Sequence, residues 1–169
     1  MVAATCSALN AGAATITSTW LGGSGAWEDP TQWSAGVPQN NASDTYTAAI
    51  DGSNPAASQV TLSSAVTVDS LRVGAGDQLQ ISNALTISGS SIRNDGLLIG
   101  SFLSGSSGAP VTLSGRGTVQ LQGGSLGSMI NQGNTIAGWG RLSDENGSFT
   151  IEEDAAATIN ATSEHTTQS

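Results

Sequence analysis

From about residue 58 onward the sequence is built of short apolar–polar–apolar triplets that alternate with small, turn-forming residues. In each triplet two apolar side chains point to one side of the chain and the polar one points to the other, which is the period-two pattern of a β-strand. No segment of about ten or more residues carries the apolar stripe of a helix, so the sequence predicts an all-β fold. The triplets lie at 60–62, 66–68, 71–73, 79–81, 85–87, 111–113, 119–121 and 149–151.

Equivalent apolar residues return at a regular interval. Two pairs of equivalent apolar residues have the same spacing along the chain. A third pair has twice this spacing, with a further apolar residue midway between its members. A repeat of about 20 residues with two or three short strands favours a parallel β-solenoid. Coils about 4.8 Å apart would then form a rod of about five coils and about 25 Å over residues 58–161. The pairs are Val60 and Leu79, Val66 and Leu85, and Val111 and Phe149, with Ile130 between the last two.

The alternative is an antiparallel β-sandwich, in which Asn94-Asp95-Gly96 and Glu145-Asn146-Gly147 would form hairpin turns. The solenoid is preferred because one coil cannot bury its inward residues alone. Stacked coils form a continuous core and pair their backbone groups with the coils above and below.

The region before the first triplet interrupts the repeat and is rich in aromatic residues, glycine and proline. The sequence therefore divides into an N-terminal extension that offers a strand for subunit contact (1–18), an aromatic capping region (19–57), the coils (58–161) and a C-terminal tail (162–169). We expect the aromatic residues to close the exposed core of the first coil. The alternative is a sugar-binding platform, and exposure of the indoles distinguishes the two. The aromatic residues are Trp20, Trp27, Trp33 and Tyr46.

The charge balance restricts the partners. Four arginines, no lysine and 13 carboxylates give a net charge of −9, so nucleic acid is a poor partner because phosphate binding needs clustered cations. No apolar run approaches the roughly 20 residues of a membrane helix, and residues 1–19 lack the pattern of a signal peptide. Cys6 is the single cysteine. It is therefore either an incidental thiol or an intermolecular link.

Catalytic and metal-binding patterns are weak, and we expect neither an enzyme nor a cofactor. Adjacent carboxylates on a strand point to opposite sides, so Glu28–Asp29 and Asp144–Glu145 are poor pairs for glycoside hydrolysis. The acidic run Glu152–Glu153–Asp154 is interpreted as a solvated turn, with Ca²⁺ binding as the alternative. His165 is the single histidine, which argues against a catalytic triad or a zinc site.

Two asparagines in the segment 130–136, Asn131 and Asn134, invite a structural interpretation. Either they point inward and hydrogen-bond along the axis of the stack, or they occupy turns with left-handed backbone.

Four stretches of the chain resemble secreted bacterial β-strand-repeat proteins, namely autotransporter passengers and filamentous-haemagglutinin-like adhesins. Residues 20–38 (WLGGSGAWEDPTQWSAGVP) are similar to the opening motif of these proteins. Residues 111–121 (VTLSGRGTVQL) and 130–142 (INQGNTIAGWGRL), followed by ATINA at 157–161, resemble their coil consensus.

The resemblance implies a right-handed parallel β-helix at the surface of a bacterium or released from it. It implies a non-catalytic structural or adhesive module, either a fibre or matrix subunit or a fragment of a larger passenger. The partners would be further copies, joined end to end or by strand addition, or a host or matrix protein or glycan. Family members usually run to many hundreds of residues, whereas this chain offers about five coils.

Overall fold

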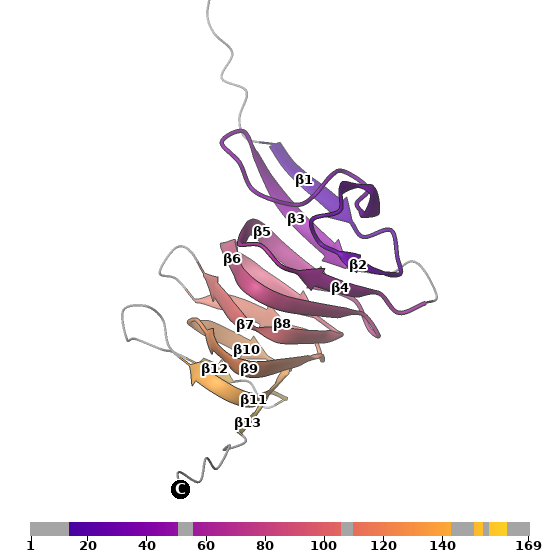
Figure 1. Ribbon diagram of the computed structural model, residues 1–169. Coiled ribbons are helices and arrows are strands. Elements are labelled where there is room, and N and C mark those ends of the chain that lie inside the picture. The colour runs from indigo at the N-terminus through magenta and orange to yellow at the C-terminus, as the bar shows by residue number, and fades with distance from the viewer. Residues whose placement is uncertain (1–13, 51–55, 106–109, 143–150, 154–155, 162–169) are drawn as a thin grey trace, which may run out of the picture.

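The computed structural model describes residues 14–50, 56–105, 110–142, 151–153 and 156–161. Within these residues every pairing between named strands is parallel, and the strands stack along one axis (Figure 1). The predicted all-β solenoid is therefore confirmed, and the antiparallel sandwich is wrong. The helical element in the described part of the chain is a single 3-10 turn, η1 (Pro30–Gln32).

The strands follow one another at short intervals. They are β1 (Ala14–Thr19), β2 (Ser24–Ala26), β3 (Asp44–Ile50), β4 (Gln59–Leu62), β5 (Val66–Val73), β6 (Gln78–Asn94), β7 (Leu97–Gly105), β8 (Val111–Ser114), β9 (Thr118–Leu126), β10 (Met129–Gln132), β11 (Thr135–Leu142), β12 (Ile151–Glu153) and β13 (Thr158–Ala161).

A complete coil has three strand segments, so the stack has three faces. The first face contains β2, β4, β13 and the opening segments of β6, β7, β9 and β11. The second contains the opening segment of β5, the middle of β6 and the closing segments of β7, β9 and β11. The third contains β1, β3, β8, β10, β12 and the closing segments of β5 and β6. The solenoid has about 4 turns, close to the predicted five.

Inward side chains of successive coils form apolar columns. On the first face each column member is the register partner of the next. Val66 and Leu85 are partners on the second face. Both of the equally spaced pairs that the sequence predicts are thus confirmed, and each fully buried aliphatic side chain contributes about 1.5–3 kcal/mol. The first-face column is Val60, Leu79, Leu98, Val119, Ile136 and Ile159.

The predicted column through Val111 is wrong by one position. Val111 pairs with Met129, which is 2% exposed, whereas Ile130 points outward and is half-buried. Met129 pairs in turn with Ile151, and this second step along the chain is longer than the first. A shift by a single position reverses the direction of every side chain in a strand. Phe149, the predicted end of this column, lies outside the described residues.

Parallel stacking begins well before residue 58, where the sequence placed the first coil. Strand β1 pairs with β3, β3 pairs with β5, and β2 pairs with β4. Between β2 and β3 the chain also touches the second face, because the backbone N–H of Asn40 donates to the carbonyl oxygen of Thr67 at 2.7 Å. The predicted capping region is therefore an enlarged first coil that also carries the aromatic residues.

Candidate functional site

The three N-terminal tryptophans form one buried cluster. They belong to the segment 20–33, whose ribbon lies at the indigo end of Figure 1. Trp20, Trp27 and Trp33 are 2%, 0% and 4% exposed. The Trp33 ring lies 4.9 Å from the Trp27 ring and 5.1 Å from the Trp20 ring, both in edge-to-face geometry. Aromatic rings favour this arrangement because the positive ring edge meets the negative face.

Each indole N–H of this cluster is also satisfied. Trp33 Nε1 donates to the carbonyl oxygen of Trp27 at 2.7 Å, and Trp27 Nε1 donates to that of Pro38 at 3.3 Å. Trp20 Nε1 donates to the carbonyl oxygen of Gly23 at 3.1 Å. The cluster is therefore packed and hydrogen-bonded as a core is.

The cluster seals the N-terminal end of the apolar columns. The backbone N–H of Trp27 donates to the carbonyl oxygen of Thr61, which immediately precedes the inward Leu62. Tyr46, on β3, is partly buried against the same core. No face of the three indoles is open to a sugar ring, so these tryptophans cannot form the alternative glycan platform.

The one acidic pair whose contacts are described, Glu28 and Asp29, supports the local fold. Glu28 Oε1 accepts hydrogen bonds from the backbone N–H groups of Ser63 (2.8 Å) and Ser64 (2.7 Å) and from Ser64 Oγ (2.8 Å). Burial alone would raise the pKa of Glu28, but these hydrogen bonds together hold it below its ordinary value. Glu28 thereby fastens the first coil to the turn after β4.

Asp29 has a different task in the same loop. Its Oδ1 accepts hydrogen bonds from the Thr31 backbone N–H (2.9 Å) and hydroxyl (2.7 Å), which caps η1. The Thr31 hydroxyl, followed by the backbone N–H, lowers the pKa of Asp29. The described hydrogen bonds of Glu28 and Asp29 are thus made within the loop and to the turn after β4.

The remaining candidate residues fall outside what the structure describes. Glu152 and Glu153 belong to β12, but their side chains lie outside the described part of the chain. The Ca²⁺ interpretation of that acidic run is therefore untested. The other candidates that lie outside the described residues are Cys6, Asp144, Glu145, Asp154 and His165.

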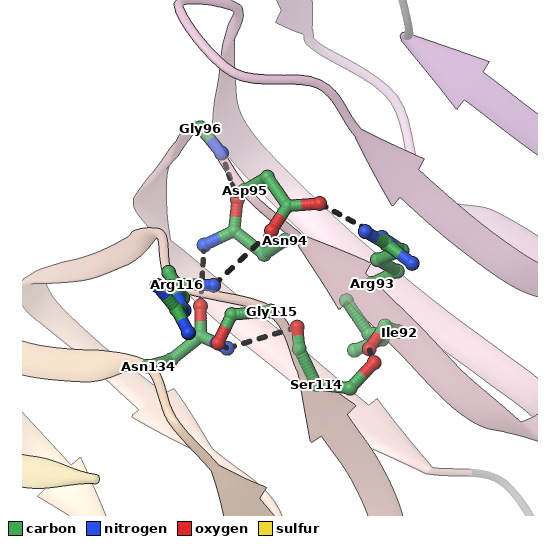
Figure 2. A network of polar contacts seen from close by, with 9 residues as sticks. All are labelled: Ile92, Arg93, Asn94, Asp95, Gly96, Ser114, Gly115, Arg116 and Asn134. Carbon is green, nitrogen blue, oxygen red and sulfur yellow. Dashed lines mark hydrogen bonds and ion pairs between the residues drawn. The ribbon is translucent and has the colours of Figure 1, made fainter. Parts of the chain in front are cut away.

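Inside the corner between the third and first faces, asparagines form a buried polar network. Asn94, Asn131 and Asn134 are all 0% exposed. Asn94 Nδ2 donates to Asn134 Oδ1 at 3.0 Å, and Asn94 Oδ1 accepts from the Gly96 N–H at 3.2 Å (Figure 2). Asn94 Nδ2 also donates to the carbonyl oxygen of Thr118 at 3.1 Å. The amides therefore bond along the axis of the stack.

Asn134 also bonds to the backbone of the preceding coil. Its Nδ2 donates to the carbonyl oxygens of Ser114 (2.9 Å) and Gly115 (3.2 Å). Asn131 Nδ2 donates to the Asn134 carbonyl oxygen at 2.9 Å, and Asn131 Oδ1 accepts from the Asn134 N–H at 3.2 Å. Among the described residues every positive φ belongs to glycine. Both asparagines therefore point inward, and the left-handed turn is wrong. Hydrogen bonding along the axis is confirmed for Asn134, whereas Asn131 bonds to Asn134 within the same corner.

The outer surface of the third face carries a column of hydroxyl groups that the sequence reasoning missed. Its members on consecutive coils are register partners, and all are serine or threonine. At one step the hydroxyl oxygens of Thr47 and Ser70 lie 2.8 Å apart and hydrogen-bond. The column ends at Ile130. Its members are Thr17, Thr47, Ser70, Ser91 and Thr112.

Two positions further along the same strands, arginines replace hydroxyls. Arg72 and Arg93 are register partners on β5 and β6, and Arg93 is the partner of Ser114 on β8. Arg93 Nε lies 2.8 Å from Asp95 Oδ2 in an ion pair (Figure 2). The spacing from Arg72 to Arg93 was the available sequence signal, since it is close to one repeat.

Comparisons with protein-family models, with curated proteins and with solved structures found no match. In the described part of the chain no helix has the length and apolar character needed to cross a membrane. Within the same residues no group of three or more histidine, cysteine, aspartate or glutamate side chains is placed to hold a metal ion.

Proposed function

We propose that this chain is a non-catalytic structural or adhesive module that acts outside a bacterial cell. The observation that carries the proposal is the parallel ladder that continues through every described coil, from β1 to β13. Such a stack gives a stiff rod with an extended, repetitive surface, and solenoid proteins use surfaces of this kind for contact with partners. The resemblance to β-strand-repeat adhesins supports the extracellular location.

The two ends of the stack support association with further copies of the chain. Among the described residues the inward column reaches as far as Ile159, which is 39% exposed, whereas its register partner Ile136 is 2% exposed. At the other end β1 pairs with β3 along one edge, and in the described residues nothing pairs with its second edge. Unpaired strand edges are templates for strand addition. Head-to-tail stacking through them would lengthen the rod into a fibre.

Negative-stain imaging and sedimentation over a wide concentration range test this proposal. We expect short rods at low concentration and longer fibres as the concentration rises. Ile159→Lys places a charge at the end of the core column and should abolish the fibres, while Leu21→Lys, at a side chain that is already 58% exposed, is the matched control. Strictly monomeric particles at every concentration would contradict the fibre subunit. Fractionation of the source bacterium tests the location, and an exclusively intracellular protein would contradict it.

A further inference from the structure

Three of the four arginines in the chain gather at one edge of the third face. Arg72 and Arg93 stand on neighbouring strands in register, and Arg116 lies two positions beyond Ser114, the register partner of Arg93. All three are exposed, and the Arg93 side chain is 60% exposed. We call this group, together with Asp95, the arginine ridge.

The arrangement runs against the electrostatics of an isolated strand pair. Neighbouring strands lie about 4.8 Å apart, and like charges opposite one another on a sheet are destabilising. The chain has no lysine and 13 carboxylates, so cations spread evenly over its surface would each be surrounded by acidic groups. Placing Arg72 beside Arg93 instead concentrates positive charge, which an anion bound from solution would stabilise.

The ridge includes the carboxylate of Asp95. Asp95 Oδ2 contacts Arg93 Nε at 2.8 Å, and Asp95 Oδ1 accepts from the backbone N–H of Arg116 at 3.2 Å (Figure 2). The hydrogen bond from Arg93 is the largest cause of a lowered pKa of Asp95, and the charge of Arg72 adds to the effect. Guanidinium groups bind planar carboxylates through a fork of N–H donors. This is the ligand chemistry that the ridge fits.

Hydroxyl groups accompany the arginines on the same outward side of the same strands. Ser70 stands two positions before Arg72, and Ser91 two positions before Arg93. Side chains at alternate positions of a strand point in the same direction. We propose that the arginine ridge and the adjoining hydroxyl column bind an acidic polysaccharide, with guanidinium groups on uronate carboxylates and serine and threonine hydroxyls on sugar hydroxyls.

The surroundings favour a polysaccharide over an acidic protein. Protein–protein interfaces have an apolar core with aromatic anchors. The large apolar side chains that are exposed among the described residues are Leu21, Trp139 and Ile159. None of them belongs to the segments of β5 and β6 that carry Arg72 and Arg93, or to the turns after β6 and β8 that carry Asp95 and Arg116. A polar, hydroxyl-rich chain with regularly spaced carboxylates matches this surface better. The inference does not depend on fibre formation.

Titration with trigalacturonate, followed by NMR of the arginine side chains and by calorimetry, tests the proposal on the full chain. We expect saturable binding that weakens as salt is raised, and no binding of the neutral trisaccharide maltotriose. The double variant Arg72→Gln/Arg93→Gln should weaken binding about tenfold or more, since each loses a charge-assisted hydrogen bond. Arg141→Gln removes the same kind of charge from β11 and is the matched control that should bind as the unmodified chain does.

Four results would overturn the inference. They are absence of binding by the unmodified chain, equal weakening in Arg141→Gln, equal binding of maltotriose, and equally tight binding of triglutamate, which would identify an acidic peptide as the ligand class. Circular dichroism and thermal unfolding of the double variant check that the fold is retained. If the double variant does not fold, the unmodified chain provides the test. On addition of trigalacturonate the chemical shifts of the Nε–Hε signals should change for Arg72 and Arg93 and remain unchanged for Arg141.

Discussion

The side-chain amide of Asn94 donates a hydrogen bond to Oδ1 of Asn134 across the coil that lies between them. The two asparagines are 40 positions apart, about twice the repeat, and the contact is possible because the intervening coil has glycine at its corner. A Cβ atom at Gly117 would lie 2.6 Å from Asn94 Nδ2 and 2.4 Å from the Gly96 carbonyl oxygen. The buried side-chain amide of Asn94 therefore requires glycine at position 117.

We expect Asn94→Ala to lower the free energy of unfolding by about 2–4 kcal/mol, because each buried group that loses its hydrogen-bond partner costs about 1–3 kcal/mol. The substitution removes the side-chain hydrogen bonds to Thr118, Asn134 and Gly96. Urea or thermal unfolding measures the loss. Gln80→Ala, at an exposed position of the same strand β6, is the control and should change stability by no more than about 0.5 kcal/mol. Similar losses in both variants would show that the network contributes little.

Gly117→Ala tests the same corner from the opposite side. Because the new methyl group would overlap the Gly96 carbonyl oxygen and the Asn94 amide, we expect a loss of about 2–3 kcal/mol or more from overpacking. Gly76→Ala is the matched control. A Cβ there meets nothing within 4 Å, but φ is +85°, so the strained backbone alone should cost about 1–2 kcal/mol. A smaller loss at Gly117 than at Gly76 would contradict the close approach of the coils.

The sequence is informative about strands and their repeat because inward apolar residues must alternate and must align from coil to coil. The triplets from 60–62 to 119–121 all lie in strands with both apolar residues buried. The alignment at Val111 could not be predicted, because the steps between coils are unequal: the step from Leu98 to Val119 is longer than the next one, from Val119 to Ile136. Corner loops absorb such differences. The mean interval between coils therefore predicts a register partner only to within a position or so. For Val111 an error of one position replaced the true partner, Met129, by Ile130.

The corners were harder to predict than the strands. Asn131 and Asn134 are conspicuous in the sequence, yet Asn94, the partner of Asn134, lies two repeats away in a segment that also suits a hairpin. The neighbouring positions of Arg72 and Arg93 in the arginine ridge can likewise be recognised only when the register of the strands is known. Local patterns indicate which side of a strand a residue faces, but contacts between coils depend on the exact length of every intervening turn.

The four tryptophans should divide into two fluorescence classes. Trp139 is 45% exposed, while Trp20, Trp27 and Trp33 are at most 4% exposed. In Trp139→Phe we therefore expect blue-shifted emission that acrylamide quenches poorly, and the difference from the unmodified chain should be a red-shifted, readily quenched component. Strong quenching in Trp139→Phe would contradict a sealed N-terminal end and would reopen the glycan platform.

Replacement of the fully buried ring tests the cluster energetically. Trp27→Ala should lower the free energy of unfolding by about 3–5 kcal/mol, because it leaves a cavity above the first column. It also removes the hydrogen bond from Trp27 Nε1 to the carbonyl oxygen of Pro38. Trp139→Ala is the matched control, and its loss should be much smaller because the side chain is already exposed. Equal losses would mean that the cluster does not close the core.

Glu28 should give the chain a specific dependence on acid. Burial works to raise its pKa, but the hydrogen bonds that its carboxylate accepts from Ser63 and Ser64 outweigh burial and hold the pKa below the ordinary value of 4.5. A carboxyl group whose pKa is lower in the folded state stabilises the fold above its unfolded pKa, and this contribution is lost as pH falls through the folded pKa.

Glu28→Gln keeps the shape of the side chain but cannot ionise, and it tests this dependence. We expect the variant to be less stable than the unmodified chain at pH 7 by about 1 kcal/mol or less, because solvent screens a carboxylate that is only partly buried. The difference should shrink once the pH falls below 4.5. Unfolding curves from pH 7 to pH 3 measure this convergence. A difference that stays constant over the range would mean that the charge of Glu28 does not hold the first coil to the turn after β4.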